Sequence, residues 1–339
     1  MGVCRGWRLA VCPLFYSTAL LDLGGTTSAE AKDVFRVMSM ADAMDNGCQH
    51  YVKDVYMAIN VYTFNEDWGG VLTDPVSVLR GCGQLSAVRS CTIRIWPHDT
   101  PALRDGDKET KTVGWCSRRI ANNIDAFVAS LAATMPNMRR VAIHTTTLYA
   151  QQPAQSRIVE QVYGCLHRLI GAQITHASLS HIGDGLGVTT VSEATALQSI
   201  ILSHLDFMPH HVELVRRNFQ SLERLHIYQL KHDTAVQMVL GGDDHEQALI
   251  YPRLKHLYIG SCLEANRPAA ALPMIDPFPR LKVLVYRGDF LLGLQVLRGE
   301  SRAHLNHLAI DINSAIFDAL FSHAGDRAGG FPGLGYVSL

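Results

Sequence analysis

The sequence predicts an α/β protein: an irregular solenoid with a curved parallel β-sheet on one side and helices on the other. Three observations lead to this prediction. A short apolar pattern recurs along the chain, an apolar-Pro-x-Leu segment precedes several of its copies, and stretches with helical spacing lie between copies. Strands that alternate with helices are joined by crossover connections, and such connections place the strands parallel in one sheet.

The recurring pattern consists of an apolar residue, a second one three positions later and a third two positions after that. Because side chains of a strand alternate between its two faces, the second and third residues share one face, which we expect to be buried. The residues beside them point the other way. Copies begin at Val52, Val88, Met138, Ile174, Leu222, Leu254, Leu281, Leu305 and Leu334.

A proline-containing segment leads into several copies in the same register. Proline ends a preceding helix, and it drives the residue before it to an extended conformation. This segment is therefore expected to turn the chain into each strand. It occurs at Met135 to Met138, Tyr251 to Leu254, Phe278 to Leu281 and Phe331 to Leu334.

Helices are expected between the copies. Apolar residues from Ile120 to Leu131 form one helical stripe that ends before Pro136. Three further helices are predicted, each with a capping residue at its start. They begin at Ser156, at Ser192 with Leu197, Ile200, Ile201 and Leu205 on the apolar stripe, and at Asn313 or Ser314.

Both a doubly wound sheet and a solenoid would satisfy this alternation, and the outward strand positions favour the solenoid. Strands that are buried on both faces read as continuous apolar runs. Here Arg224, His226 and Tyr228 alternate with apolar residues, so one face of the sheet is expected to be open. Copies lie about 24 to about 50 residues apart, which makes the array irregular.

Composition limits the classes of function. The chain has 339 residues, of which 47% are hydrophobic and 18% charged, so it can bury a core without metals or disulfides. A formal net charge of -1 provides no broad basic field, which disfavours general binding to nucleic acid or to anionic membranes. No stretch is long and apolar enough to span a bilayer.

The cysteines and the N-terminus indicate the compartment. The eight cysteines are scattered without a C-x-x-C pair, which is typical of buried thiols in a reducing compartment. Arg5 and Arg8 precede an apolar run, but Pro13 interrupts it and no small-x-small cleavage site follows, so a signal peptide is disfavoured. We expect a cytoplasmic or nuclear protein.

The repeat resembles the leucine-rich repeat, L-x-x-L-x-L-x-x-N/C, which two copies follow to its last position, at Cys262 and Asn313. The N-terminus resembles the second half of an F-box, through Val3, Cys4, Trp7 and Leu9. Together they resemble fungal F-box and leucine-rich-repeat-like proteins. The resemblance implies an F-box remnant over 1–23 and a leucine-rich-repeat-like solenoid over 24–339. The solenoid is expected to be truncated, because the chain ends on the third apolar position of a copy.

The resemblance also implies a partner. An F-box protein is the substrate receptor of an SCF-type ubiquitin ligase and binds a Skp1-type adaptor, while its repeats choose the substrate. The family grips the adaptor chiefly with an L-P-x-E segment and the helix after it, and this chain starts beyond both. Binding of the adaptor through the residual F-box is therefore the alternative interpretation here.

Two short motifs suggest chemistry, and both have a simpler interpretation. Gly183 to Gly187 follows an expected strand like a nucleotide phosphate loop, but Val188 stands where G-x-G-x-x-G needs its third glycine, so a flexible turn is favoured. The run from Asp243 to Glu246 groups metal-ligand types, yet adjacent residues rarely all face one ion, and a solvated acidic turn is favoured. No catalytic signature is present. We expect no enzyme activity, cofactor or metal, and a nucleotide-dependent enzyme is the disfavoured third interpretation.

The open face of the sheet is the predicted binding site for a protein partner. Histidine, arginine and tyrosine combine apolar bodies with polar tips and are common where proteins bind proteins. Concave faces of solenoids are the usual contact surface. The predicted partner-binding residues are Arg224, His226, Tyr228, His256, Tyr258, Arg287 and His307.

Overall fold

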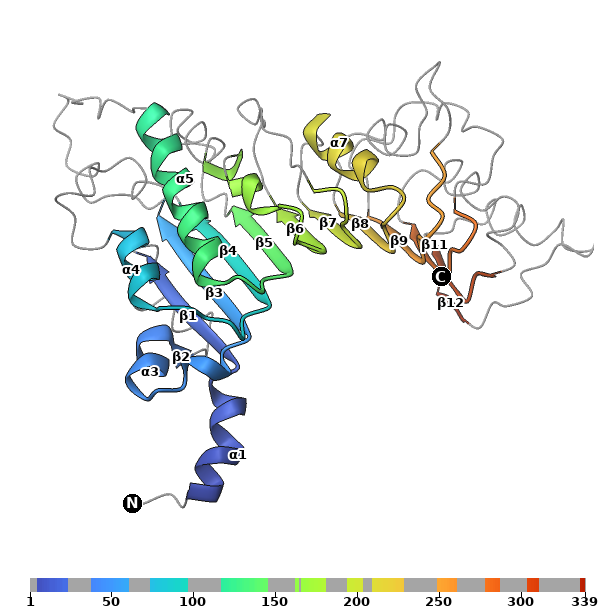
Figure 1. Cartoon of the computed structure of the whole chain (residues 1–339). Coiled ribbons are helices and arrows are strands. Elements are labelled where there is room, and N and C mark those ends of the chain that lie inside the picture. The colour runs from blue at the N-terminus through green and yellow to red at the C-terminus, as the bar shows by residue number, and fades with distance from the viewer. Residues whose placement is uncertain are drawn as a thin grey trace, which may run out of the picture. The chain divides into compact units, whose positions relative to one another are not determined.

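The computed structural model describes residues 5–23, 38–60, 74–96, 117–145, 162–164, 166–180, 194–203, 209–228, 249–260, 278–286, 304–310 and 336–338. These residues form an α/β structure whose strands are parallel (Figure 1). The chain divides into two compact units, and we describe each by itself. Unit 1 comprises Met1–Ile174 with His181–Ser192, and unit 2 comprises Thr175–Ser180 with Glu193–Leu339.

Unit 1 contains a parallel sheet in the order β5-β4-β3-β1-β2. Its strands are β1 (Thr18–Leu23), β2 (Met38–Ser39), β3 (Asp54–Asn60), β4 (Ser90–Trp96) and β5 (Arg140–Thr145). β1 pairs with β3 along its whole length, from Thr18 to Leu23. The sheet therefore begins before residue 24, so the boundary that we placed after residue 23 does not mark where the sheet starts.

The helices of unit 1 are α1 (Arg5–Phe15), α3 (Met40–Asp45), α4 (Pro75–Gly81) and α5 (Ser117–Thr134), with short 3₁₀ turns at Gln49–Tyr51 and His167–Leu169. The Asp74 side chain caps α4 by accepting a hydrogen bond from the Val76 amide at 2.9 Å. α4 and α5 lie side by side over the same face of the sheet (Figure 1). The stripe predicted from Ile120 to Leu131 is confirmed, because Ile120, Ile124, Phe127 and Leu131 are all fully buried in α5.

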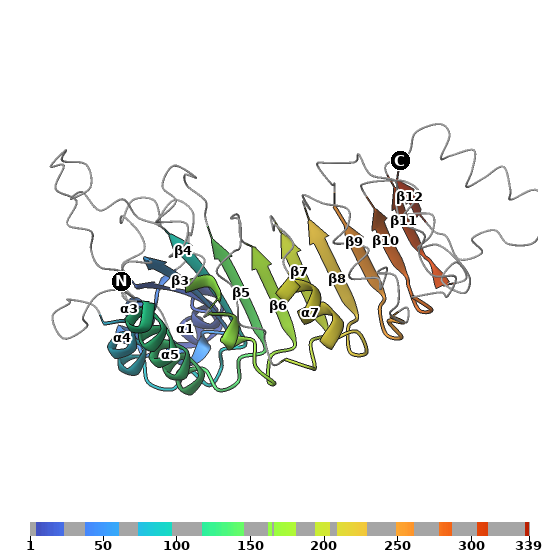
Figure 2. The ribbon, with the colours of Figure 1, turned by 90° about the horizontal axis from the view of Figure 1, so that it is seen from above.

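Unit 2 contains a parallel sheet in the order β12-β11-β10-β9-β8-β7-β6, so each strand pairs with the next one along the chain. Figure 2 shows these strands from above, with α7 (Pro209–Arg217) across β7 and β8. The strands are β6 (His176–Ser180), β7 (Ser199–Ser203), β8 (Arg224–Tyr228), β9 (His256–Ile259), β10 (Val283–Tyr286), β11 (His307–Ile310) and β12 (Tyr336–Ser338).

The apolar pattern forms the core, as predicted. In unit 2 its second positions Leu225, Leu257, Leu284 and Leu308 are at most 1% exposed. They are also in register, since each is the direct partner of the next across neighbouring strands. Burying one such leucine contributes about 2 kcal/mol. A strand occurs at every copy that we predicted, although the third positions of the last three copies lie outside the described side chains.

The helix predicted from Ser192 is wrong. Ser199–Ser203 is strand β7, which pairs with β6 on one side and β8 on the other. Leu197, Ile200 and Leu202 match the recurring pattern and are fully buried, whereas Ile201 is partly exposed. The apolar residues of this short segment fit both a helical and a strand period, and pairing with two neighbouring strands decides between them.

The other predicted helices are only partly described. Val162 to Gly164 is helical and leads to the 3₁₀ turn at His167–Leu169, while Ser156 lies outside the described residues. The helix expected at Asn313 or Ser314 also lies outside them.

A buried asparagine joins α7 to the segment before β7. Asn218 is 1% exposed, and its amide group donates hydrogen bonds to the carbonyls of Ala194 and Leu214, both at 2.8 Å. Its side-chain oxygen accepts from the Leu197 amide at 2.9 Å. These bonds give partners to buried backbone groups. They also join the C-terminal end of α7 to the segment before β7.

Candidate functional site

Strands β8 and β9 bring five of the predicted partner-binding residues together. Arg224, His226 and Tyr228 alternate with buried residues along β8, and His256 and Tyr258 do so along β9. Arg224 is the direct register partner of His256, and His226 is that of Tyr258. Arg224 is exposed and the other four are partly exposed. They therefore stand on the face of the unit 2 sheet that points away from the apolar core.

The rings on this face contact one another closely. The ring centroids of Tyr228 and Tyr258 are 4.4 Å apart, with the ring planes tilted by 35°. The ring of His226 lies 5.8 Å from that of Tyr258 and meets that of Tyr228 edge-on at 6.0 Å. The Tyr228 hydroxyl shares a hydrogen bond of 3.3 Å with His226 Nδ1. Such contacts hold the rings in place and so prepare a contact surface at little further loss of side-chain entropy. We call His226, Tyr228, His256 and Tyr258 the tyrosine–histidine cluster.

Burial and neighbouring positive charges disfavour protonation of the two imidazoles of the cluster. Burial is the main cause that lowers the pKa of His226, and the neighbouring His256 and Arg224 lower it further. Burial also lowers the pKa of His256, with Arg224 and two lysines adding to the effect. Burial and the neighbouring Tyr258 raise the pKa of Tyr228, so its hydroxyl keeps its proton. The cluster therefore offers hydrogen bonds and ring faces rather than a nucleophile.

The remaining predicted residues do not join the cluster. His307 on β11 is partly exposed, but Val283 of β10 stands between it and His256 in register. Arg287 lies outside the described residues. Of the predicted F-box remnant, Val3 and Cys4 lie outside the described residues, and Trp7 and Leu9 belong to the first half of α1, where the structure describes the backbone alone.

Apolar neighbours that the sequence analysis missed extend the site. Ile201, His226, Tyr258, Val285 and Ala309 are register partners across β7 to β11, and all five are partly exposed. We call these residues the central row. The signal was present in the sequence, because each one stands between the second and third apolar positions of its copy of the pattern. The predicted partner-binding residues at these positions comprise only polar and aromatic types.

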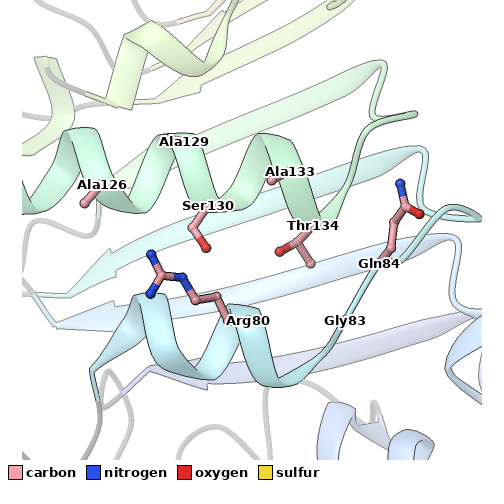
Figure 3. Close-up of a pocket in the computed structure, with 8 residues that line it drawn as sticks. All are labelled: Arg80, Gly83, Gln84, Ala126, Ala129, Ser130, Ala133 and Thr134. Atoms are coloured by element: carbon pink, nitrogen blue, oxygen red, sulfur yellow. The ribbon is translucent and has the colours of Figure 1, made fainter.

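A hollow lies on the helical side of unit 1. It is an open groove of about 470 Å³ between α4 and α5 (Figure 3). Alanines of α5 and Thr134 form one wall, and Arg80 and Gln84 stand at the other. The Thr134 hydroxyl bonds the Leu79 carbonyl at 3.4 Å, which ties the two helices together beneath the groove. The small side chains of α5 leave this space between the two helices unfilled, which accounts for the groove without a ligand.

The structure does not describe the two sequence motifs that suggested chemistry. Gly183 to Gly187 and Asp243 to Glu246 both lie outside the described residues. Within the described part of the chain, no group of three or more histidine, cysteine or acidic side chains is placed to hold a metal ion. No helix in that part has the length and apolar character that crossing a membrane requires.

Comparison of the chain with family models, with curated proteins and with solved structures found no match. The resemblances to the leucine-rich repeat and to the F-box therefore rest on the residues of this chain alone.

Proposed function

We propose that this chain is a non-enzymatic protein-interaction module and that its partner binds the outward face of the unit 2 sheet. The observation that carries the proposal is the tyrosine–histidine cluster, whose rings are packed together yet partly exposed. Among the residues that the structure describes, α7 lies across β7 and β8 (Figure 2) and has buried apolar side chains, whereas the cluster residues alternate with the buried residues of β8 and β9 and so stand on the other face of the sheet. Tyrosine and arginine at the centre of an open surface are the residue types that dominate binding energy between proteins.

The shape of the site favours a protein over a small molecule. Pockets for small ligands are concave and enclose most of the ligand surface. Here the side chains stand on a sheet face, and the central row runs across it from β7 to β11. With strands about 4.8 Å apart, four strand steps give a row about 19 Å long. That length suits a segment of another protein.

The repeat interpretation belongs to the same proposal. We regard the chain as an irregular leucine-rich-repeat-like solenoid, because each strand of unit 2 pairs with the next copy of the pattern and the second pattern positions form one buried row. In such an array each unit covers only its neighbours, so the outward sheet face stays available for binding.

A crosslinking experiment tests the proposed function. A photoreactive phenylalanine analogue replaces Tyr258 in one variant of the full chain. In a second variant, which serves as the control, the analogue replaces Arg217, an exposed residue of α7 in the same unit. Cells that express the gene are irradiated and the crosslinked proteins are identified by mass spectrometry. We expect a defined protein to be captured from position 258 and not from position 217. Capture of the same proteins from both positions, or of none, would refute the proposal.

A second candidate function rests on α1. Leu14 and Phe15 at its end are 76% and 64% exposed, which is unusual for large apolar side chains. A Skp1-type adaptor would bind them if the chain acts as a substrate receptor of an SCF-type ubiquitin ligase. Co-precipitation of the purified adaptor with the native chain, and its loss on changing Leu14 and Phe15 to serine, tests this function. The crosslink from position 258 should not depend on these two residues.

A further inference from the structure

Cationic side chains border the tyrosine–histidine cluster on one side, at the edge where the strands begin. The sequence Pro-Arg-Leu-Lys occurs immediately before β9, at residues 252–255, and again immediately before β10, at residues 279–282. Neighbouring copies stack in register, since the Lys282 amide donates to the Lys255 carbonyl at 2.8 Å. Like residues of the two copies therefore stand side by side, about 4.8 Å apart.

The charges of this edge act together on the cluster. Arg224, Lys255 and Lys282 all disfavour protonation of His256, so all three lie close enough to affect it. Arg224 and Lys282 are exposed, as are Arg253 and Arg280 of the two repeated segments. We call Arg224, Arg253, Lys255, Arg280 and Lys282 the basic edge.

One acidic residue stands within the basic edge. Glu223 Oε2 accepts a hydrogen bond from Lys255 Nζ at 2.9 Å, and Arg253 and Arg224 also stabilise its carboxylate. Glu223 neutralises part of the edge and leaves the exposed Arg224, Arg280 and Lys282 with cationic character. The whole chain has a formal charge of -1, so this concentration of positive charge is a local feature.

Building on the proposed function, we infer that the partner presents an acidic protein segment to unit 2, with its carboxylates on the basic edge and its apolar side chains on the central row. Arg224 precedes His226 by two residues on β8, which is about 7 Å, and Lys255 and Lys282 precede Tyr258 and Val285 by three residues each, which is about 10 Å. The basic edge therefore runs alongside the central row at the end where the strands begin. A segment that crosses the strands can place acidic residues on one of its sides and apolar residues on the other. Carboxylates are the complementary charge for exposed arginine and lysine, and they guide the partner into register.

The test uses a random peptide library displayed on phage, selected on the immobilised full chain at low salt. The most enriched peptide is synthesised with a fluorescent label, and a matched peptide replaces each of its acids by the corresponding amide. Fluorescence anisotropy then gives Kd for the native chain and for four variants. These are Arg224→Glu with Lys282→Glu on the basic edge, Glu223→Gln within it, Tyr258→Ala in the tyrosine–histidine cluster, and Arg80→Glu on α4 as the charge-change control. Circular dichroism verifies that each variant folds.

We expect the enriched peptides to be acidic with aromatic or aliphatic residues between the acids. The double variant and the amide peptide should each bind about tenfold more weakly, which corresponds to about 1.4 kcal/mol. Glu223→Gln should bind the acidic peptide more tightly, because it removes a negative charge that stands within the basic edge. Arg80→Glu should leave Kd unchanged.

The outcomes separate this inference from the proposed function. If the enriched peptides bind in a way that depends on Tyr258 but contain no acidic residues, the inference of an acidic partner is wrong and the proposed protein-binding function still holds. A library that yields no binder dependent on Tyr258 refutes both. If Arg80→Glu weakens binding as much as the double variant does, net charge explains the binding and the inference is wrong. If single-stranded RNA displaces the peptide at a lower concentration than unlabelled peptide does, a nucleic acid is the better ligand and the inference is also wrong.

Discussion

Two adjacent residues of β7 distinguish the strand from the helix that the sequence first suggests. A helix over this segment would bury Ile201 with Leu197, Ile200 and Leu205 and would leave Leu202 off the stripe. In the structure Leu202 is fully buried and Ile201 is partly exposed on the outward face. The changes Leu202→Ala and Ile201→Ala should therefore have very different effects on stability.

The structure sets the size of the difference. Leu202 stands in register between Leu179 and Ile227, which are at most 1% exposed. Truncating it leaves a cavity in packed surroundings and should lower the free energy of unfolding by about 3 kcal/mol. Ile201 stands between Ser178 and His226. Because its side chain is already partly in water, its loss should cost only about 1 kcal/mol.

Urea titration followed by far-UV circular dichroism measures both variants against the native chain. With a dependence on the order of 2 kcal/mol per molar urea, the midpoint of Leu202→Ala should fall about 1 M below that of Ile201→Ala. Midpoints that coincide, or that fall in the reverse order, would refute the inward orientation of Leu202. The alternation of buried and exposed residues that defines the outward face of the sheet would then be wrong at β7.

Three further predictions concern buried groups. Asn218→Leu removes three hydrogen bonds to buried backbone groups and should lower the free energy of unfolding by about 3 kcal/mol, measured by the same titration. Burial lowers the pKa of His226 and His256, so the unfolded chain takes up protons first as the pH falls below about 6.5. The free energy of unfolding should therefore be highest above that pH and should decline toward pH 5. The urea midpoint should decline less over this range in the variant that carries both His226→Gln and His256→Gln. Burial raises the pKa of Cys91 to about 12, so mass spectrometry should find iodoacetamide on the partly exposed Cys12 of the native chain and on Cys91 only after denaturation.

The strands were predictable where the pattern was strong and its entry segment was present. Met135 to Met138 and Tyr251 to Leu254 each form a turn, closed by a hydrogen bond from the amide of the last residue to the carbonyl of the first. Strands β5 and β9 begin two residues later. β1 was missed because its buried residues Ala19 and Leu21 lie within the segment 1–23, which was interpreted as an F-box remnant. β7 was missed because a segment with several apolar residues in succession fits two periods at once.

The candidate site was predictable in part. The outward positions of β8 and β9 follow from alternation alone, which correctly placed His226 and Tyr258 on one face. Contacts between rings depend on side-chain rotamers, which the alternation does not specify. The predicted site also lacked Val283, which stands between His256 and His307 in register, because the prediction included only polar and aromatic residues of the outward face.

The irregular spacing of the copies does not disturb their stacking, and the backbone shows why. The Glu223 carbonyl accepts hydrogen bonds from the amides of Lys255 and His256, at 2.9 and 3.0 Å. The Lys255 carbonyl does the same one copy later for Lys282 and Val283, at 2.8 and 2.9 Å. These bonds join fixed positions of the pattern whatever the length of chain between them, so a longer connection changes what covers the sheet but not its register. The same register therefore places the charges of the two Pro-Arg-Leu-Lys segments on one edge of the sheet, next to the rings of the tyrosine–histidine cluster.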